Sequence, residues 1–491
     1  MANPPYIQLQ KDGGQLAKLY ENKNFETFTR SGDIYSLFYE RGFGLLKEKG
    51  VLCFITSNKW MRAGYGEKSR RFFAEKTKPL LIIDFGSVKV FSTATVDNNI
   101  LMLQKAEKEV GKGVLAVRTE KDFDFSQGLS AYIKQNGYQL SALSQNSWVI
   151  GEKDEFDIKG RVEKQGVPLN KWKIQINYGI KTGFDKAFII DGETKDELIE
   201  SDEKNAEIIK PILRGKHIQK FHPNFSNIWL VNSHNGVKSK EIKRIDVEKD
   251  YPTIFEHLEE YESELNKRQD KGDTWTNLRN CAYLEDFEKP KIIFMEMTKY
   301  FNFLFDDEGY YANKTCWILT GESLFWLTCL FNSKLFYYCF KDNFPELQGG
   351  TRLLSKIFFD KIPVKQIFED EEKPFKAIVD YIMLLKKQIQ RLKAENEDYQ
   401  TELVMSLFFE QLSDALVLET YLQEDFENAN VSIKKYLPEF SELDKEDVEK
   451  SWQSVRKTYE EVEHFTHPLR GNLGAMKSIL TVQIIYNTVR F

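Results

Sequence analysis

Three short apolar runs near the N-terminus constrain the fold of this 491-residue chain most strongly. They are residues 51–56 (VLCFIT), 80–85 (LLIIDF) and 99–103 (NILML). Each has the length and composition of a buried β-strand. Residues 33–47, just before the first run, instead repeat their apolar side chains at helical spacing. Helices that alternate with buried strands are typical of an α/β fold. The short link between the last two runs has no helical pattern, so we expect these two strands to pair antiparallel.

The rest of the chain divides into three further segments by pattern. Residues 109–150 form a polar connector with some strand character, and residues 151–368 mix short strands, turns and many aromatic side chains. This mixture predicts an α+β domain. Residues 369–491 are largely helical in pattern, and six apolar side chains from Phe375 to Leu392 recur in steps of three and four. We therefore expect an α-helical C-terminal region, in which these side chains form a short coiled coil or one helix of a bundle.

Composition leaves a nucleic-acid partner open although the net charge is −6. Residues 366–491 carry 15 basic and 24 acidic side chains, whereas residues 1–365 carry 54 basic and 51 acidic ones. Binding to a polyanion needs a local basic surface rather than a basic total. The chain has no apolar stretch of membrane-spanning length, no signal-peptide pattern, no C-x-x-C pair and no zinc-ligand spacing. We therefore expect a cytoplasmic protein with reduced cysteines and neither a membrane nor a metal site.

The tetrapeptide Asn3-Pro4-Pro5-Tyr6 carries the clearest chemistry. The Asn3 side-chain carbonyl and the Pro4 backbone carbonyl can both accept hydrogen bonds from an exocyclic amino group, and two prolines stiffen the turn. Tyr6 offers a flat ring on which an extruded base can stack. A proline-containing loop without function is the alternative. The residue types favour a pocket that holds a planar amino group during its alkylation.

Two later blocks accompany the tetrapeptide. The first comprises residues 33–35, 50–57 and 58–60, and the second comprises residues 90–91 and 96–103. Together they resemble the blocks of amino-methyltransferases that use Asn-Pro-Pro-Tyr. More closely, the chain resembles the C-terminal part of TaqI-like adenine-specific DNA methyltransferases, and the methylase and specificity parts of type IIG restriction–modification proteins.

The resemblance implies a role for each of these residues. Asn3 and Pro4 would bind the amino group of a flipped adenine, while Tyr6 and Phe91 would sandwich the base. A core aromatic at a strand end is the alternative for Phe91. Asp33 would have a cofactor-side role, although a helix N-cap explains it equally well. The methyl donor would be S-adenosylmethionine, reacting by direct transfer without a metal or a covalent intermediate.

Basic residues in the aromatic segment mark the part expected to contact DNA. Residues 177–188 and 210–218 both resemble the target-recognition domain of TaqI-like enzymes. Basic turns suit contact with phosphates or the reading of guanine. A solvated basic turn is the alternative for any one residue. The candidate DNA-binding residues are Lys181, Lys186, Lys210, Arg214, Lys216 and His217.

The resemblance also implies a function for each segment of the chain. Residues 1–108 would be the C-terminal half of the catalytic domain, a partial Rossmann-like methyltransferase sheet, followed by the connector 109–150. Residues 151–368 would be the target-recognition domain, and residues 369–491 the helical spacer. The glycine-rich turn and the ribose-binding acid of the cofactor site would precede Asn3. We therefore expect the main S-adenosylmethionine site to be missing, the chain to be inactive alone, and a second polypeptide to supply that half and a nuclease.

These observations predict an adenine-specific DNA methyltransferase component of a restriction–modification system, which binds double-stranded DNA and flips its target base. Two alternatives remain open. One is a non-catalytic DNA-binding specificity module. Binding of S-adenosylmethionine without an added subunit would argue against this alternative. The other is an RNA or protein-glutamine methyltransferase, because the same tetrapeptide serves those acceptors. Methyl transfer to RNA but not to double-stranded DNA would favour the latter.

Overall fold

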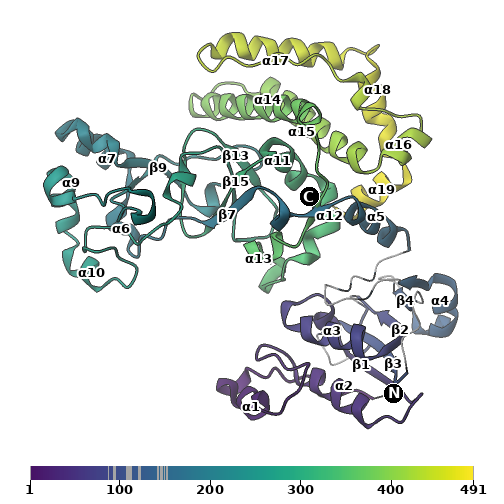
Figure 1. Ribbon diagram of the computed structural model, residues 1–491. Coiled ribbons are helices and arrows are strands. Elements are labelled where there is room, and N and C mark those ends of the chain that lie inside the picture. The colour runs from purple at the N-terminus through teal and green to yellow at the C-terminus, as the bar shows by residue number, and fades with distance from the viewer. Residues whose placement is uncertain are drawn as a thin grey trace. The chain divides into compact units, whose positions relative to one another are not determined.

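The chain is a mixed α/β protein that forms two compact units (Figure 1). The first unit combines Met1–Lys164 with Cys339–Gln348, and the second combines Gln165–Tyr338 with Gly349–Phe491. The computed structural model describes residues 2–86, 88–91, 96–106, 113–119, 123–140, 143, 148, 150 and 153–489. No helix in those ranges is long and apolar enough to cross a membrane.

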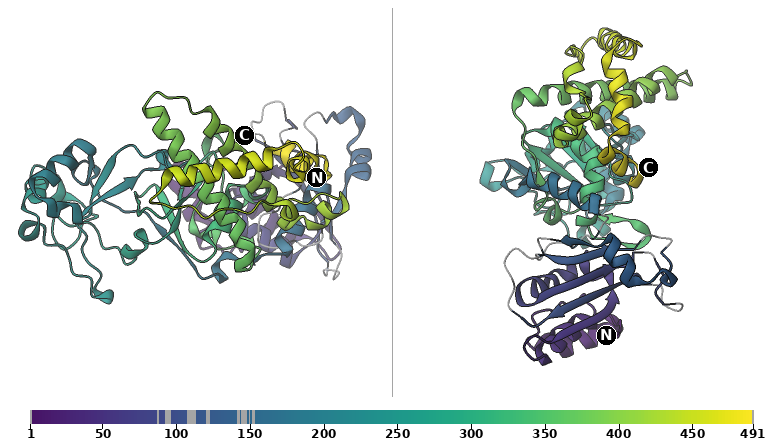
Figure 2. Two further views of the ribbon diagram at one scale, coloured as in Figure 1. Left: turned by 90° about the horizontal axis from the view of Figure 1, so that it is seen from above. Right: turned by 90° about the vertical axis from the view of Figure 1, so that its right-hand side faces the viewer.

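The first unit is built on one five-stranded sheet with the strand order β1-β3-β2-β4-β5. The right-hand view of Figure 2 shows this sheet, in purple and blue. Its strands are β1 (Val51–Ser57), β2 (Lys78–Asp84), β3 (Asn98–Gln104), β4 (Val114–Arg118) and β5 (Tyr138–Leu140). Because β3 pairs antiparallel with both β1 and β2, the latter two run in the same direction. The three predicted strands and the antiparallel pairing of the last two are confirmed.

Strands β4 and β5 come from the segment predicted as a connector, and they extend the same sheet. β4 pairs parallel with β2, and β5 pairs antiparallel with β4. The sheet therefore continues past residue 108. The connector residues 109–112, 120–122, 141–142, 144–147 and 149 lie outside the described residues.

Both faces of this sheet are buried. Phe54 and Leu101 belong to an apolar cluster on one face, whereas the neighbouring Ile55 and Ile100 belong to a second cluster on the other face. Helix α3 links β1 to the parallel β2, which is the kind of crossover that parallel strands require. The helices of this unit are α1 (Lys11–Glu21), α2 (Ile34–Leu45), α3 (Glu67–Lys76), α4 (Leu129–Asn136) and α5 (Lys153–Lys164).

The second unit contains two four-stranded sheets. The first is antiparallel with the order β13-β11-β15-β7, formed by β7 (Ile174–Tyr178), β11 (Lys291–Met295), β13 (Phe303–Asp306) and β15 (Cys316–Gly321). The second has the order β14-β9-β10-β8, formed by β8 (Ile189–Asp191), β9 (Ile209–Leu213), β10 (Ile228–Val231) and β14 (Tyr311–Ala312). Two short pairs are β6 (Val167–Pro168) with β17 (Pro363–Val364), and β12 (Met297–Thr298) with β16 (Arg352–Leu353). The predicted mixture of short strands and turns is confirmed.

Short helices surround these sheets. They are α6 (Asp185–Phe188), α7 (Gly192–Ser201), α8 (Val247–Asp250), α9 (Pro252–Glu259), α10 (Glu262–Lys267), α11 (Leu324–Asn332), α12 (Lys334–Phe340) and α13 (Lys356–Phe359).

The C-terminal helices pack on the same unit as these sheets. They are α14 (Glu369–Ala394), α15 (Gln400–Tyr421), α16 (Gln423–Asn428), α17 (Val448–Glu463), α18 (Pro468–Ala475) and α19 (Leu480–Thr488). The six apolar side chains that were predicted to recur in steps of three and four, from Phe375 to Leu392, are all buried in α14. The Trp326 ring of α11 packs on Phe375 with the ring centroids 4.9 Å apart. The Glu372 carboxylate accepts a hydrogen bond from the backbone N–H of Trp326 at 3.2 Å. Helix α14 is thus packed on α11, which in turn contacts β13 of the antiparallel sheet.

Candidate functional site

The Asn3–Tyr6 tetrapeptide lies at the carboxyl edge of the first sheet. Ala2 pairs in parallel with Phe54 of β1. Its N–H donates to the Cys53 carbonyl, and its carbonyl accepts the Ile55 N–H, each at 3.0 Å. The tetrapeptide therefore begins just beyond a strand-like residue that runs in the direction of β1. Ligands of parallel sheets bind outside the carboxyl ends of the strands, so this position suits a functional site.

The two carbonyl groups predicted to hold an amino group are not used in hydrogen bonds by the described part of the chain. Asn3 is exposed and Pro4 is buried. Neither the Asn3 side chain nor the Pro4 carbonyl forms a hydrogen bond with another residue of the described ranges. The turn thus presents two unused acceptors within two consecutive residues.

The Tyr6 ring is half-buried and held by its hydroxyl group. The hydroxyl donates to the Ile55 carbonyl at 3.4 Å and accepts a hydrogen bond from the Asn98 side-chain amide at 3.2 Å. The ring also meets Tyr35 edge-on, with the centroids 6.0 Å apart. Burial raises the pKa of Tyr6, while the Asn98 hydrogen bond lowers it. The phenol is therefore neutral, and its ring is fixed by the sheet.

Asn98 is the site residue that the sequence prediction missed. It is the first residue of β3 and only 1% exposed. A buried amide needs hydrogen-bond partners, so an asparagine at the head of an apolar strand was a signal that could have been followed. Asn98 lies within the block 96–103 that carried the family resemblance, but the pattern did not show which ring it would contact.

Asp33 faces the loop that follows the tetrapeptide. The Ile34 N–H donates to the Ile7 carbonyl at 2.9 Å, and the Leu9 N–H donates to the Gly32 carbonyl at 2.9 Å. Asp33 occupies the N-cap position of α2, but its side chain forms no capping hydrogen bond. Its Oδ1 is buried without a partner in the part of the chain that is described, and burial raises the pKa of the carboxyl group. The Oδ1 atom is therefore a buried acceptor that no described residue satisfies.

Phe91 lies on the other face of the sheet from Tyr6. It is half-buried and packs beside the cluster that contains Ile55 and Ile100, whereas Tyr6 packs beside the cluster that contains Phe54. No ring contact joins Phe91 and Tyr6 within the described ranges, and residues 92–95 lie outside them. The structure therefore does not bring the two predicted stacking rings together.

A buried hydrogen-bond network supports this edge of the sheet. The Asn99 Oδ1 accepts the Thr56 hydroxyl at 3.0 Å and the Trp60 indole N–H at 3.1 Å. Asp84, at the end of β2, pairs with the Arg62 guanidinium at 2.7 Å. These side chains connect the ends of neighbouring strands, so they position the edge on which the tetrapeptide lies.

In the second unit, the turn that contains Lys181 lies at one end of the antiparallel sheet. The Tyr178 ring stacks on Trp317 of β15 with the ring centroids 3.5 Å apart, and the Lys181 Nζ lies 5.7 Å from the centroid of Tyr178. The Tyr178 hydroxyl donates to the carboxylate of Glu296, which directly follows β11, at 3.3 Å. Lys181 itself is exposed.

The turn that contains Lys216 reaches the same end of the sheet. The Gly215 N–H donates to the Thr315 hydroxyl at 3.1 Å. A Cβ at Gly215 would lie 3.3 Å from the Met295 side chain, so only a small residue fits here without displacement. Met295 pairs with Cys316 across β11 and β15. The structure thus brings the exposed Lys181 and Lys216 to one end of one sheet, although they are distant in sequence.

His217 is held inside its turn. Its Nδ1 accepts the Arg214 backbone N–H at 3.1 Å, and its Nε2 is 2.9 Å from the Ser226 hydroxyl. Burial and the neighbouring Lys216 lower the pKa of His217, so the ring is neutral at pH 7. Both ring nitrogens are used within the chain. Arg214 is half-buried, and its Nε has no partner among the described residues.

The two remaining basic candidates have different surroundings. Lys186 is exposed on α6. The Lys210 Nζ lies 3.8 Å from the Glu288 carboxylate, which also accepts the Tyr311 hydroxyl at 2.8 Å. A contact between Lys210 and a phosphate would therefore compete with this ion pair.

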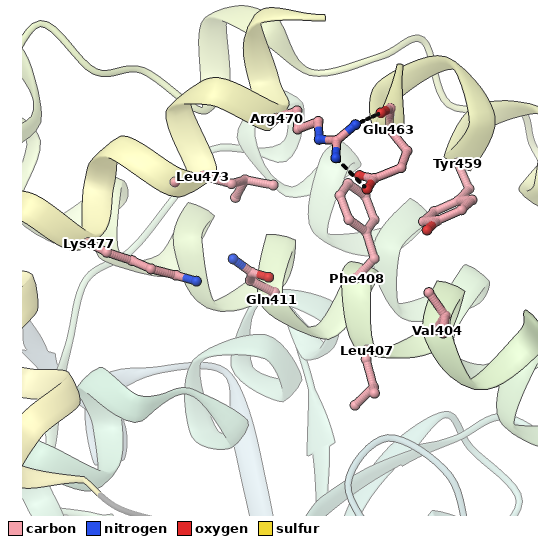
Figure 3. Close-up of a pocket in the computed structure, with 10 residues that line it drawn as sticks. Val404, Leu407, Phe408, Gln411, Tyr459, Glu463, Arg470, Leu473 and Lys477 are labelled. Atoms are coloured by element: carbon pink, nitrogen blue, oxygen red, sulfur yellow. Dashed lines mark hydrogen bonds and ion pairs between the residues drawn. The ribbon is translucent and has the colours of Figure 1, made fainter. Parts of the chain in front are cut away.

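A pocket of about 400 Å³ lies among α15, α17 and α18 (Figure 3). The exposed side chains of Val404 and Leu407 contribute to its lining, and Arg470 pairs with Glu463 at 3.6 Å. None of the predicted site residues lines it. The described ranges also contain no group of three His, Cys, Asp or Glu side chains that could hold a metal ion.

Comparison with known proteins finds family matches for two segments of the chain. Residues 1–91 match the family described as Eco57I restriction-modification methylase, and residues 210–364 match the TaqI-like C-terminal specificity domain. The chain is related to type II restriction–modification methyltransferases. The resemblance predicted from the sequence motifs is thereby confirmed. The first match includes the Asn3–Tyr6 tetrapeptide, and the second includes Lys216 and Glu296.

Three similar proteins illustrate this relationship. The type II methyltransferase M.BanIII of Aneurinibacillus aneurinilyticus is 24% identical over 72% of this chain and 67% of the relative. M.BstVI of Geobacillus stearothermophilus is 24% identical over 66% of this chain and 59% of the relative. The type II restriction enzyme and methyltransferase RM.Eco57I of Escherichia coli is 27% identical over 55% of this chain and 28% of the relative. The matched region thus spans between 28% and 67% of the length of these relatives.

Among solved structures, the type IIL restriction-modification enzyme MmeI in complex with DNA aligns with 99% of this chain and 57% of its own. The two share 14% sequence identity, and the TM-score is 0.44.

Proposed function

We propose that this chain is the target-base and specificity part of an adenine-specific DNA methyltransferase from a restriction–modification system. The placement of the Asn3–Tyr6 tetrapeptide carries the proposal. It lies at the carboxyl edge of a buried sheet, with both amino-group acceptors unused and its tyrosine ring anchored. The names of the type II methyltransferase relatives support the class of reaction.

The chemistry follows from the groups that the turn presents. The Asn3 and Pro4 carbonyl oxygens can accept both hydrogens of one exocyclic amino group. Such bonds would draw the nitrogen lone pair out of conjugation with the ring and make it the nucleophile. The neutral Tyr6 ring suits stacking of an extruded base, which offsets part of the few kcal/mol that flipping costs. S-adenosylmethionine supplies the methyl group when bound, and the chain contributes positioning.

We place the cofactor at the same edge of the sheet, with Asp33 as a candidate contact because its buried Oδ1 lacks a partner in the described ranges. Apart from Ala2, no described residue pairs with the outer edge of β1. An open strand edge can accept a further strand. We propose that another segment or a second polypeptide pairs there and completes the cofactor site. The first sheet would then be the target-base half of a Rossmann-like methyltransferase domain.

Double-stranded DNA is the proposed partner of the second unit. Lys181 and Lys216 lie exposed at one end of a sheet, where they can contact phosphates. Arg214 can read guanine if it moves outward. The buried, neutral His217 would hold the turn in shape, and Phe91 would contribute to the target pocket after rearrangement of its loop.

The test is methyl transfer from labelled S-adenosylmethionine to duplex DNA and to RNA, combined with calorimetric titration of the cofactor. With the chain purified together with any partner that completes the cofactor site, we expect label in the adenine amino group of DNA, and its loss in Asn3→Ala. Asn136→Ala, at an exposed asparagine of α4, is the matched control. Label in RNA alone would contradict the proposal. Sequence-selective DNA binding by a chain that neither binds the cofactor nor transfers methyl groups in any assembly would support a non-catalytic specificity module.

A further inference from the structure

A carboxylate stands between the two lysine-bearing turns of the second unit. Glu296 directly follows β11 and accepts the Tyr178 hydroxyl at 3.3 Å, while Lys181 lies over the Tyr178 ring. The turn that contains Lys216 rests on Met295, the neighbour of Glu296. A negative charge in this place repels phosphate. A surface that only held the DNA backbone would therefore bind more tightly without it.

The backbone of Glu296 is fixed on both sides. Its N–H donates to the Thr315 carbonyl at 3.0 Å, and its carbonyl accepts the Leu354 N–H at 2.7 Å. Its side-chain partner Tyr178 is held as well, because the ring stacks on Trp317. A side chain that is held before binding loses little conformational freedom on binding, and so it can distinguish between closely similar ligands.

Glu296 also keeps hydrogen-bonding capacity for a ligand. Its side chain is half-exposed, and only its Oε1 accepts a hydrogen bond from a described residue. It forms no ion pair within the described part of the chain, whereas Glu285 pairs with Lys240 and Glu288 pairs with Lys210. Its charge is therefore not neutralised by a neighbouring cation.

We propose that Glu296 determines specificity by accepting a hydrogen bond from the exocyclic amino group of one base in the recognition sequence. Cytosine N4 and adenine N6 present such a donor in the major groove, and acidic side chains are known to accept from cytosine. The lysines on either side would contact the backbone and hold the carboxylate against the base edge. This inference rests on the proposed DNA-binding function of the second unit.

The experiment selects preferred sequences from a pool of random DNA duplexes with the full chain, as wild type, Glu296→Ala and Glu322→Ala. Glu322 is the matched control because it is also half-exposed, follows the opposite end of β15, and accepts one N–H, from Lys173, at 3.1 Å. Because alanine lacks any side-chain acceptor, we expect Glu296→Ala to reduce the preference for cytosine or adenine at one position by about 5- to 150-fold. The other positions should keep their preferences, and Glu322→Ala should select the wild-type sequence.

A second variant separates a specificity role from a folding defect. Tyr178→Phe retains the ring stack on Trp317 but removes the hydroxyl that orients Glu296. We expect it to weaken the preference at the same position and at no other. Selection of the wild-type sequence by Glu296→Ala would overturn the inference and leave the proposed function intact. A uniform loss of affinity for all sequences would also overturn it. A wild-type chain that selects no sequence would instead overturn the proposed function.

Discussion

At the scale of single residues, the proposed base pocket depends on the Tyr6 ring. Tyr6→Ala removes the surface on which an extruded base would stack, and loss of an aromatic stacking platform costs about 1–3 kcal/mol per base. We expect base extrusion to fall accordingly, measured as the fluorescence of 2-aminopurine placed at the target adenine. Tyr6→Phe retains the ring and is the control. Equal fluorescence for wild type and Tyr6→Ala would show that this ring does not hold the base.

The hydrogen bond from Asn98 to the Tyr6 hydroxyl leads to a second prediction. Asn98→Ala removes the donor at 3.2 Å from a buried position and should weaken extrusion by about 1 kcal/mol. Because Tyr6→Phe removes the other partner of the same bond, the double variant should lose less than the sum of the two single losses. Strictly additive losses would show that Asn98 does not act through the Tyr6 hydroxyl. Urea unfolding of each variant gives the separate effect on stability.

At the scale of elements, β11 and β13 are joined by a buried ion pair. Lys291 is fully buried and pairs with Asp306 at 2.5 Å, and the two residues lie opposite each other in the strand register. Lys291→Met leaves an uncompensated carboxylate in the core, which costs about 3–5 kcal/mol. We expect the free energy of unfolding of the second unit, measured by urea titration, to fall by that amount. Lys373→Met removes an exposed lysine from a surface ion pair with Asp370 and should have little effect.

His222 makes the stability of the second unit depend on pH. Burial lowers the pKa of its imidazole to about 4, although Glu308 raises it somewhat. The unfolded chain binds the proton more readily, so this stability is present above about pH 6.5 and is lost as the pH falls towards 4. The expected loss is up to about 3 kcal/mol over that range. His222→Leu should flatten the pH dependence of urea unfolding, whereas His464→Leu, at an exposed histidine, should follow the wild type. Parallel curves for all three proteins would contradict the assignment.

Elements with one strong local pattern were predictable from the sequence. The three apolar runs form β1, β2 and β3, and the apolar side chains from Phe375 to Leu392 form the buried face of α14. Each pattern was visible because the side chains that an element buries recur with the period of that element. The sequence did not show that β4 and β5 join the first sheet, since that pairing depends on long-range contacts.

The candidate site was predictable only in its residue types. The sequence singled out the Asn3–Tyr6 tetrapeptide, but its position at the carboxyl edge depends on the pairing of Ala2 with β1. The convergence of Lys181 and Lys216 depends on packing against Met295 and Thr315, which lie far away in the sequence. Glu296 was not singled out because an isolated glutamate after an apolar strand has the pattern of an ordinary solvated residue.

At the scale of the whole molecule, DNA binding must overcome a net charge of −6 through local basic turns. Each phosphate contact adds about −0.9 to the slope of log affinity against log salt concentration. We expect the double variant Lys181→Ala/Lys216→Ala to reduce the magnitude of this slope by about 2. Binding isotherms at several salt concentrations provide the measurement, with Lys387→Ala/Lys445→Ala on the acidic C-terminal helical region as the control. An unchanged slope in the Lys181/Lys216 variant would place the phosphate contacts elsewhere.

The identity of the methylated atom tests the central claim most directly. The chain would be purified from its native cells together with any bound partner and incubated with plasmid DNA and S-adenosylmethionine. Sequencing would then locate the modified bases in the plasmid. The proposed function predicts N6-methyladenine within one short recognition sequence, and its absence when Asn3 is replaced by alanine. Methylation of cytosine, modification without a common sequence, or methyl transfer to RNA alone would contradict it.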